Sequence, residues 1–293
     1  MQDKENREVK NSVFVELFYA DESAEENDIA LFNAIHDEPL SEGTIIRRFK
    51  VDTTIYMHFQ NDISFDAGGK LLVFGEHQST VNENMPFRSL LYIGRACEQI
   101  VVVRDRYKRK RVPLPTPEFY TFYNGKEKGD KEKELRLSDA YMVKDFQPML
   151  DLKVKMINVN SSEQHEILER CQVLREYSQF IDMVTKYQET DVSEPYKKAI
   201  QECIKKGILA EYLKRKGSEV ENMLTAEYDY ELDIEVQREE AFESGKELGE
   251  KVGIGKLNQL YAKLKQLGRN EDILKAIEDA EYQKKLLEEF GLS

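Results

Sequence analysis

The sequence predicts an α/β domain over residues 1–190, with the element order α-β-β-β-α-β, followed by a helical C-terminal region over residues 191–293. Apolar residues recur at helical spacing near the N-terminus, and a strand pattern replaces this spacing from Thr53 onward. Beyond residue 190 the strand signal disappears. A chain of 293 residues, 40% hydrophobic and 34% charged, is long enough for one large domain or two modest ones with a real core.

The first predicted elements are two short helices and a hairpin. Apolar residues at helical spacing occur in NSVFVELF (11–18) and LFNAIH (31–36). Strands are expected at TTIYMHF (53–59), NDISF (61–65) and KLLVFGEHQS (70–79). The segment DAGG, Asp66 to Gly69, predicts a hairpin turn because glycine accepts the positive φ that such turns require. The last two strands are therefore expected to pair antiparallel.

The second half of the domain is predicted to add helices and further strands. After Pro86, a residue suited to a first helical position, we expect a packed helix with Leu90, Gly94, Cys97 and Val101 on its buried face. Strand-like runs follow at FYTFY (119–123), ELRLSDAY (134–141) and LDLKVKMINVN (150–160). Ser161 and Gln164 form a capping box, which predicts one long helix through Val184.

The C-terminal region is predicted to be helical from Pro195 onward. Residues 219–250 are highly charged, and glycines recur every four residues at Gly245, Gly249 and Gly253. Each glycine inside a helix costs about 1 kcal/mol of helix stability. This stretch is therefore interpreted as a hinge or exposed arm. An amphipathic leucine stripe from Leu257 to Leu267 then predicts a small helical module, which we expect either to mediate self-association into a homo-oligomer or to regulate access to the core.

Composition narrows the expected partners and location. No apolar run approaches the ~20 residues of a membrane-spanning helix, so we expect no membrane contact and a cytoplasmic protein. Three widely spaced cysteines do not suggest a disulfide framework or a zinc cluster. A net charge of -13 argues against nucleic-acid binding by the whole surface, yet the segment Arg104–Arg111 gathers six basic residues. That run is either a DNA contact or a solubilising loop.

Asp62 and Glu76 are the candidate catalytic residues. They lie on neighbouring predicted strands, where facing side chains approach within about 5 Å, so that both carboxylates could share one divalent cation. Such a cation would activate water for phosphodiester hydrolysis, and Gln78, on the same face as Glu76, could orient that water. The alternative is that the two acids are ordinary surface residues near a turn.

The segment EHQSTVNENMPFRSLLYI (76–93), within residues 61–100, resembles the signature of the Rpn family of recombination-promoting nucleases. These are transposase-like members of the PD-(D/E)XK nuclease superfamily. The resemblance extends to NSVFVELF, to PTPEFYTFYNG (115–125), to the LKVKMINVN strand and to the glycine-spaced tail. It implies a restriction-endonuclease-like core and a metal-dependent DNA endonuclease, with DNA as partner and Mg²⁺, or else Mn²⁺ or Ca²⁺, as cofactor.

The resemblance also assigns residues. Asp62 and Glu76 match the two acids of the superfamily motif, and Gln78 stands where the superfamily usually has lysine. Because a lysine would stabilise the developing phosphate charge, its absence leaves open a catalytically weak or inactive scaffold that binds DNA or protein. Lys153 or Lys155 on a later strand is a possible substitute. Glu16 on the first helix is either a further metal ligand or a solvent-facing residue.

Several other residues have two interpretations. His77 should point away from Glu76 and is interpreted as a packed or hydrogen-bonded core histidine, and His36, His58 and His165 as structural. Polar residues before the Pro86 helix could bind a phosphate, but helix capping is the favoured role: Ser79, Thr80, Asn82 and Asn84. Arg88 and Arg95, on one face of that helix, are additional phosphate candidates.

Overall fold

The computed structural model describes residues 13–49, 51, 62–127, 129–145, 147–190 and 192–292, except for the side chains of 227–235 and 247–248. The chain divides into two compact units, Met1–Glu227 and Tyr228–Ser293. The boundary differs from the expected division at residue 190, because Ala199, Ile200 and Cys203 are buried in the core of the first unit. The expected strand over residues 53–59, with His58, lies outside the described residues.

The first unit combines a sheet with helices before, within and after it. Its strands are β1 (Ile46–Arg48), β2 (Ile63–Ala67), β3 (Leu71–Gln78), β4 (Thr116–Tyr123), β5 (Glu132–Arg136) and β6 (Lys153–Asn158). Its helices are α1 (Val13–Val15), α2 (Ala24–Ile35), α3 (Met85–Ile100), α4 (Glu166–Arg170), α5 (Gln172–Gln188) and α6 (Pro195–Lys206). A π-helical turn, η2 (Glu16–Ala20), continues α1, and short 3₁₀ turns follow at η3 (Val103–Tyr107), η4 (Leu137–Ala140) and η5 (Ser161–Glu163).

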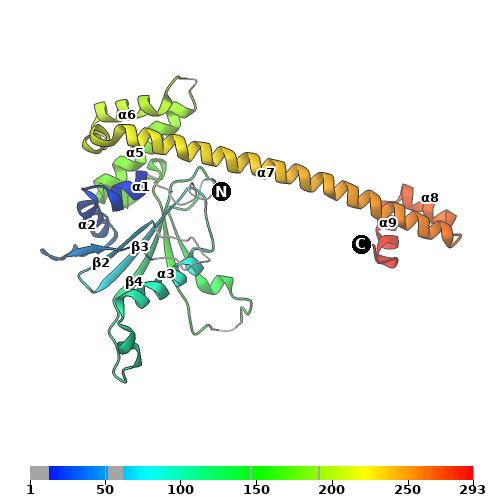
Figure 1. Cartoon of the computed structure of the whole chain (residues 1–293), viewed down its shortest axis with the longest axis horizontal. Helices are drawn as coiled ribbons and strands as arrows, with labels where there is room; N and C mark the ends of the chain where they lie inside the picture. Colours follow the sequence, from blue (N-terminus) through cyan, green and yellow to red (C-terminus); the bar gives the residue numbers. More distant parts are fainter. Residues whose placement is uncertain are drawn as a thin grey trace. The chain divides into compact units, whose positions relative to one another are not determined.

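The six described strands form one mixed sheet in the order β1-β2-β3-β4-β6-β5. Figure 1 labels the neighbouring strands β2, β3 and β4. Strands β1, β2 and β3 pair antiparallel, β3 pairs parallel with β4 and β4 with β6, and β5 closes the sheet antiparallel to β6. The parallel step from β3 to β4 requires a crossover, which α3 provides. The α/β prediction and the helical C-terminal region are thus confirmed.

The turn between β2 and β3 matches its prediction. Gly68 and Gly69 both adopt positive φ, +63° and +71°. The Oδ1 of Asp66 accepts a hydrogen bond from the backbone N–H of Gly69 at 2.7 Å, which closes the turn. This local chemistry fixes the register of the hairpin, in which Ala67 is paired with Leu71 and Ile63 with Gly75.

The two faces of the sheet support separate cores. Val73 of β3 belongs to the larger core, beneath α1, α2 and α5, whereas Leu72 and Phe74 belong to the smaller core, beneath α3 (Figure 1). Side chains alternate along a strand, so Glu76 and Gln78 share the α3 face with Phe74, and His77 shares the other face with Val73. The candidate site residues therefore lie on the α3 side.

The buried face of α3 differs from the predicted one. Ser89, Tyr92 and Ala96 are buried, while Gly94 is exposed and Leu90 is half-buried. The predicted face followed the apolar residues, but small residues let the helix approach the sheet closely. The hydroxyl of Tyr92 accepts a hydrogen bond from Arg88, one turn earlier on the same helix.

The long helix predicted from Ser161 is divided in two, and its cap is different. Gln164 adopts a positive φ of 49°, and Cys171 separates α4 from α5 with an extended backbone. His165 caps α4, because its Nδ1 accepts a hydrogen bond from the backbone N–H of Ile167 at 3.0 Å. The structural role expected for this histidine is thereby confirmed, and the capping box is not formed.

The C-terminal region contains α7 (Ala210–Gln266), α8 (Asn270–Glu278) and α9 (Ala280–Glu289). The glycine-spaced stretch is helical throughout, contrary to the expected hinge, because Glu, Lys, Leu and Ala around the glycines favour the helix. Side chains 236–246 are exposed, as an arm requires. Leu260 and Leu264 are buried against Ala276 and Leu286 within the second unit, whereas Leu267 is exposed.

Within the described part of the chain, none of the helices combines the length and the apolar character needed to cross a lipid bilayer.

Candidate active site

Asp62 and Glu76 lie side by side at one end of the central hairpin. The register pairs Ile63 with Gly75, which places Asp62 opposite Glu76 on the same face. The Oδ2 of Asp62 accepts a hydrogen bond from the backbone N–H of His77 at 2.8 Å. The negative charge of Asp62 also acts on the Glu76 carboxyl. The structure therefore brings the two predicted acids together.

Glu76 is a buried carboxyl with one oxygen in contact and one without a partner. Only 5% of its surface is exposed. Burial and, to a smaller extent, the Asp62 charge together raise the pKa of Glu76 to about 8, against the opposing effect of the Arg88 guanidinium. Among the described atoms, its Oε1 has no hydrogen-bond partner. Burying such an oxygen costs free energy that a bound cation would offset.

Arg88 contacts this carboxyl from α3. Its Nη2 donates to Oε2 of Glu76 at 3.0 Å and to the hydroxyl of Tyr92 at 2.9 Å. Arg88 stands near the start of α3, which begins with Met85 above the end of β3. The sequence identified Arg88 as a phosphate candidate but not as the partner of Glu76. The spacing of Glu76 and Arg88 in the sequence does not indicate this contact, since the contact depends on how α3 packs on the sheet.

Gln78 and Thr121 complete the polar surroundings of Glu76. The Nε2 of Gln78 donates to the Sδ of Met85 at 2.8 Å. Thr121 of β4 is the register partner of Glu76, and sequence reasoning did not find it because the parallel pairing of β3 and β4 has no local signature. In the described structure, the Oε1 of Gln78 and the Oγ1 of Thr121 are buried and lack hydrogen-bond partners, as does Glu76 Oε1.

This donor set fits a hard divalent cation. Two carboxylates and a neighbouring amide oxygen are ligands that Mg²⁺, Mn²⁺ or Ca²⁺ prefer, and Mg²⁺ keeps several water ligands when protein ligands are few. Within the residues that the structure describes, no group of three or more His, Cys, Asp or Glu side chains is gathered closely enough to hold a metal. Asp62 and Glu76 would thus hold the ion together with water or substrate oxygens.

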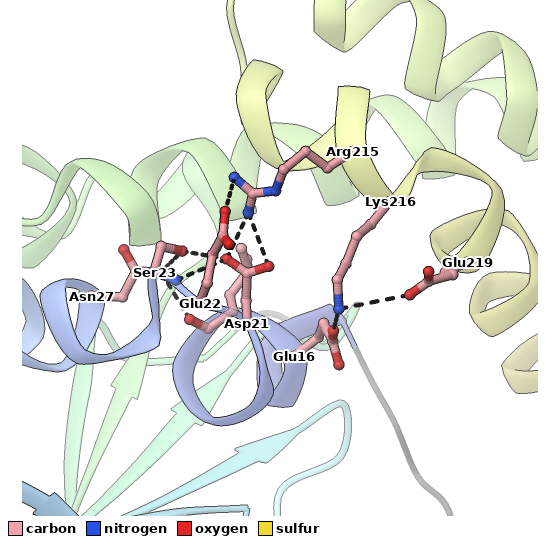
Figure 2. A network of polar contacts seen from close by, with 9 residues as sticks. Glu16, Asp21, Glu22, Ser23, Asn27, Arg215, Lys216 and Glu219 are labelled. Carbon is pink, nitrogen blue, oxygen red and sulfur yellow. Dashed lines mark hydrogen bonds and ion pairs between the residues drawn. The ribbon is translucent and has the colours of Figure 1, made fainter.

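Glu16 is not part of this pair, contrary to the expectation of a metal contact. It is 6% exposed, so it is not the solvent-facing residue of the alternative either. Its Oε1 accepts from the Nζ of Lys216 at the start of α7, and Figure 2 shows this contact beside that of Lys216 with Glu219. The sequence could not reveal this partner, which lies 200 residues away along the chain.

The two lysines considered as substitutes for the missing catalytic lysine face away from Glu76. Thr121, the partner of Glu76, pairs with Met156, so the neighbouring Lys155 points to the opposite face. Its Nζ contacts Glu132 at 2.7 Å, and the Nζ of Lys153 contacts Glu134 at 3.1 Å. Strand alternation thus excludes both as substitutes in this structure.

His77 occupies the opposite face from Glu76, as alternation predicts. Its ring stacks on Phe14 with centroids 4.7 Å apart, and its Nε2 is hydrogen-bonded to the hydroxyl of Tyr177 at 2.8 Å. His36 is likewise held structurally, by the carbonyl of Phe32 and by Glu118. The interpretation of these residues as packed or hydrogen-bonded histidines is confirmed.

The remaining candidates are divided between the two ends of β3. Before α3, the Oδ1 of Asn82 accepts from the backbone N–H of Asn84 at 2.9 Å, a local turn that leads into the helix. The basic run Arg104–Arg111 instead follows the C-terminal end of α3 and leads to Thr116, which pairs with Leu71 at the start of β3. The basic run and the carboxylate pair are thus at opposite ends of this strand.

No family model matches the sequence, and comparisons with curated proteins and with solved structures found no significant match.

Proposed function

We propose that the chain is a metal-dependent DNA endonuclease with a restriction-endonuclease-like core, linked by its resemblance to DNA recombination or transposition. The observation that carries this proposal is the adjacent pair Asp62 and Glu76, with a buried Glu76 oxygen that has no partner among the described residues. Two carboxylates on paired strands suit one divalent cation. When bound, the cation would lower the pKa of its water and supply the nucleophile.

The residues of the chain would then hold and orient the reactants. Asp62 is fixed by the His77 backbone, and Glu76 by its place within β3. Gln78 Oε1 could accept a hydrogen bond from the attacking water and so orient it. Arg88 supplies a positive charge on the same face, and positive charge near a scissile phosphate stabilises the transition state.

The alternative is an inactive scaffold that binds DNA or protein. One observation favours it: the Arg88 guanidinium already neutralises Glu76, and Lys153 and Lys155 face away from the site. A carboxylate satisfied by arginine has less need of a metal. The two functions therefore differ in whether a divalent cation binds at Asp62 and Glu76.

Cleavage of supercoiled plasmid tests the proposal. Purified wild type and Asp62→Ala are compared in Mg²⁺, Mn²⁺, Ca²⁺ or EDTA at low salt. Nicking that requires metal and disappears in the variant supports the nuclease. Equal residual cleavage by both proteins indicates a contaminant, and no cleavage by either, in any metal, favours the inactive scaffold.

A further inference from the structure

We propose that Arg88 is an exchangeable cation of this site: it contacts Glu76 in the metal-free protein, is displaced from the carboxylate by a divalent cation, and then pairs with the phosphodiester. This inference rests on the proposed metal site, but it concerns a residue that the superfamily motif does not assign. Its basis is the contact of the guanidinium with Glu76 Oε2 at 3.0 Å.

Two cations in close contact with Glu76 would repel one another. Two positive charges a few ångströms apart repel one another strongly where the effective dielectric is low, and a divalent ion doubles this repulsion. The side chain of Glu76 is only 7% exposed, so little water screens the repulsion. Binding of a metal at Glu76 therefore favours movement of the guanidinium away from the carboxylate.

Arg88 has a second partner and access to solvent, both of which such an exchange requires. Its side chain is 21% exposed. The hydroxyl of Tyr92, one helical turn further on, accepts from the same Nη2 at 2.9 Å and can hold the guanidinium after it leaves Glu76. Tyr92 is buried, and its hydroxyl also interacts with the Glu76 carboxyl, so it lies between the two groups that would separate.

A charge count identifies the class of ligand that the displaced arginine fits. A divalent cation binds the ionised form of Glu76, so that the two carboxylates, the guanidinium and the cation together carry a net charge of +1. One phosphodiester, with a single negative charge, restores neutrality. A buried site with an uncompensated charge is costly, so metal and phosphodiester are expected to bind cooperatively.

The test compares Arg88→Gln with Arg170→Gln, which removes an arginine from α4 on the other side of the sheet. Arg170 donates to the carbonyls of Asn33 and His36 and is distant from β3 Glu76 in the fold. Two quantities are measured on the full chain. The first is the Mn²⁺ concentration at which the rise in melting temperature is half complete, and the second is the affinity for a DNA duplex in Ca²⁺.

We expect Arg88→Gln to bind Mn²⁺ about tenfold more tightly and to bind DNA about tenfold more weakly, with Arg170→Gln unchanged. Equal or weaker Mn²⁺ binding by folded Arg88→Gln overturns the inference, as does the absence of Mn²⁺ binding by every protein. These readouts do not require cleavage. A tighter Mn²⁺ midpoint without any cleavage by wild type would reject the nuclease but retain the exchange.

A measurement on wild type covers the case in which Arg88→Gln does not fold. Phenylglyoxal modifies accessible guanidinium groups, and mass spectrometry locates the modified arginine. We expect Mn²⁺ to accelerate modification of Arg88 and added DNA to suppress it, while modification of Arg170 stays constant. A rate at Arg88 that Mn²⁺ leaves unchanged overturns the inference.

Discussion

The backbone N–H of His77 donates a 2.8 Å hydrogen bond to the Oδ2 of Asp62, across the first pair of residues beyond the β2–β3 ladder. His77 follows Glu76 directly, so this bond fixes the Asp62 carboxylate beside the strand that carries the second acid. The ring of His77 is held on the opposite face of the sheet by Phe14 and Tyr177. The core on one side of the sheet thereby stabilises the geometry of the site on the other side.

Asp62→Asn should separate structure from ion binding. The amide keeps an oxygen that accepts from His77 but lacks the negative charge that attracts a divalent cation. We expect a melting temperature close to that of wild type without metal and at least about a tenfold loss of Mn²⁺ affinity. The metal-induced rise in melting temperature measures this. An undiminished rise in the variant would contradict the assignment of Asp62 as a ligand.

The basic run should contribute to DNA affinity from a distance. It lies at the far end of β3, and a strand of 8 residues spans roughly 25 Å. Replacing Arg109, Lys110 and Arg111 by glutamine should weaken DNA binding and reduce its dependence on salt, because fewer counterions are released. Cleavage at saturating DNA should remain close to wild type. An unchanged salt dependence would favour the solubilising role of this loop.

The sequence predicted those parts of the site that depend on local chemistry. Alternation along β3 separates Glu76 from His77, and the Asp66–Gly69 turn sets the register that places Asp62 opposite Glu76. Both signals are contained within less than twenty residues of sequence. The same reasoning predicted the α/β fold and the helical tail, since these depend on period and composition.

Contacts formed by packing between distant elements were missed. Glu16 meets Lys216, and Arg88 meets Glu76 only because α3 settles on that face of the sheet. Thr121 becomes a neighbour of Glu76 through parallel strand pairing, whose register no turn specifies. Periodicity assigns a residue to a face of its own element but does not say which element covers that face.

Asp28 is a second buried carboxyl, far in sequence from the candidate site residues of the hairpin. It is fully buried on α2, and its nearest cation, Arg48 Nε, is 4.0 Å from its Oδ2. Neither carboxylate oxygen has a hydrogen-bond partner among the described residues. Burial raises the pKa of Asp28 to about 8, against the opposing effect of Arg48.

Because the folded-state pKa of Asp28 lies above its ordinary value of 3.8, the folded state binds the proton more tightly. Asp28 therefore lowers the free energy of unfolding as the pH rises from about 4 toward 8. Asp28→Asn removes this loss and should stabilise the protein by about 1–3 kcal/mol at pH 7.5, but little at pH 4. Urea unfolding at pH 7.5 and at pH 4 measures this change in the free energy of unfolding. Exposed Asp130→Asn is the control, and equal effects of the two variants would contradict the prediction.

Arg215 joins the start of α7 to the N-terminal helices by two bonds to Asp21, from Nη2 to Oδ1 at 2.9 Å and to Oδ2 at 3.0 Å (Figure 2). Asp21 is 3% exposed and also accepts from the hydroxyl and backbone N–H of Ser23. Burial raises the pKa of Asp21, but the bonds from Ser23 and Arg215 outweigh it and lower the pKa below its ordinary value.

Arg215→Ala should therefore destabilise the protein at neutral pH, and by more than the loss of an exposed ion pair, because a buried carboxylate loses its charged donor. A lowered folded-state pKa gives stability that is present above the ordinary value of 3.8 and is lost as the pH falls through the folded-state value. The difference between variant and wild type should accordingly shrink in acid. Lys214→Ala, which removes an exposed pair with Glu211, is the matched control. Urea unfolding at pH 7 and pH 3.5 measures the loss of stability in both variants. A loss in Arg215→Ala that equals that of the control, or that does not depend on pH, would show that Asp21 does not need this arginine.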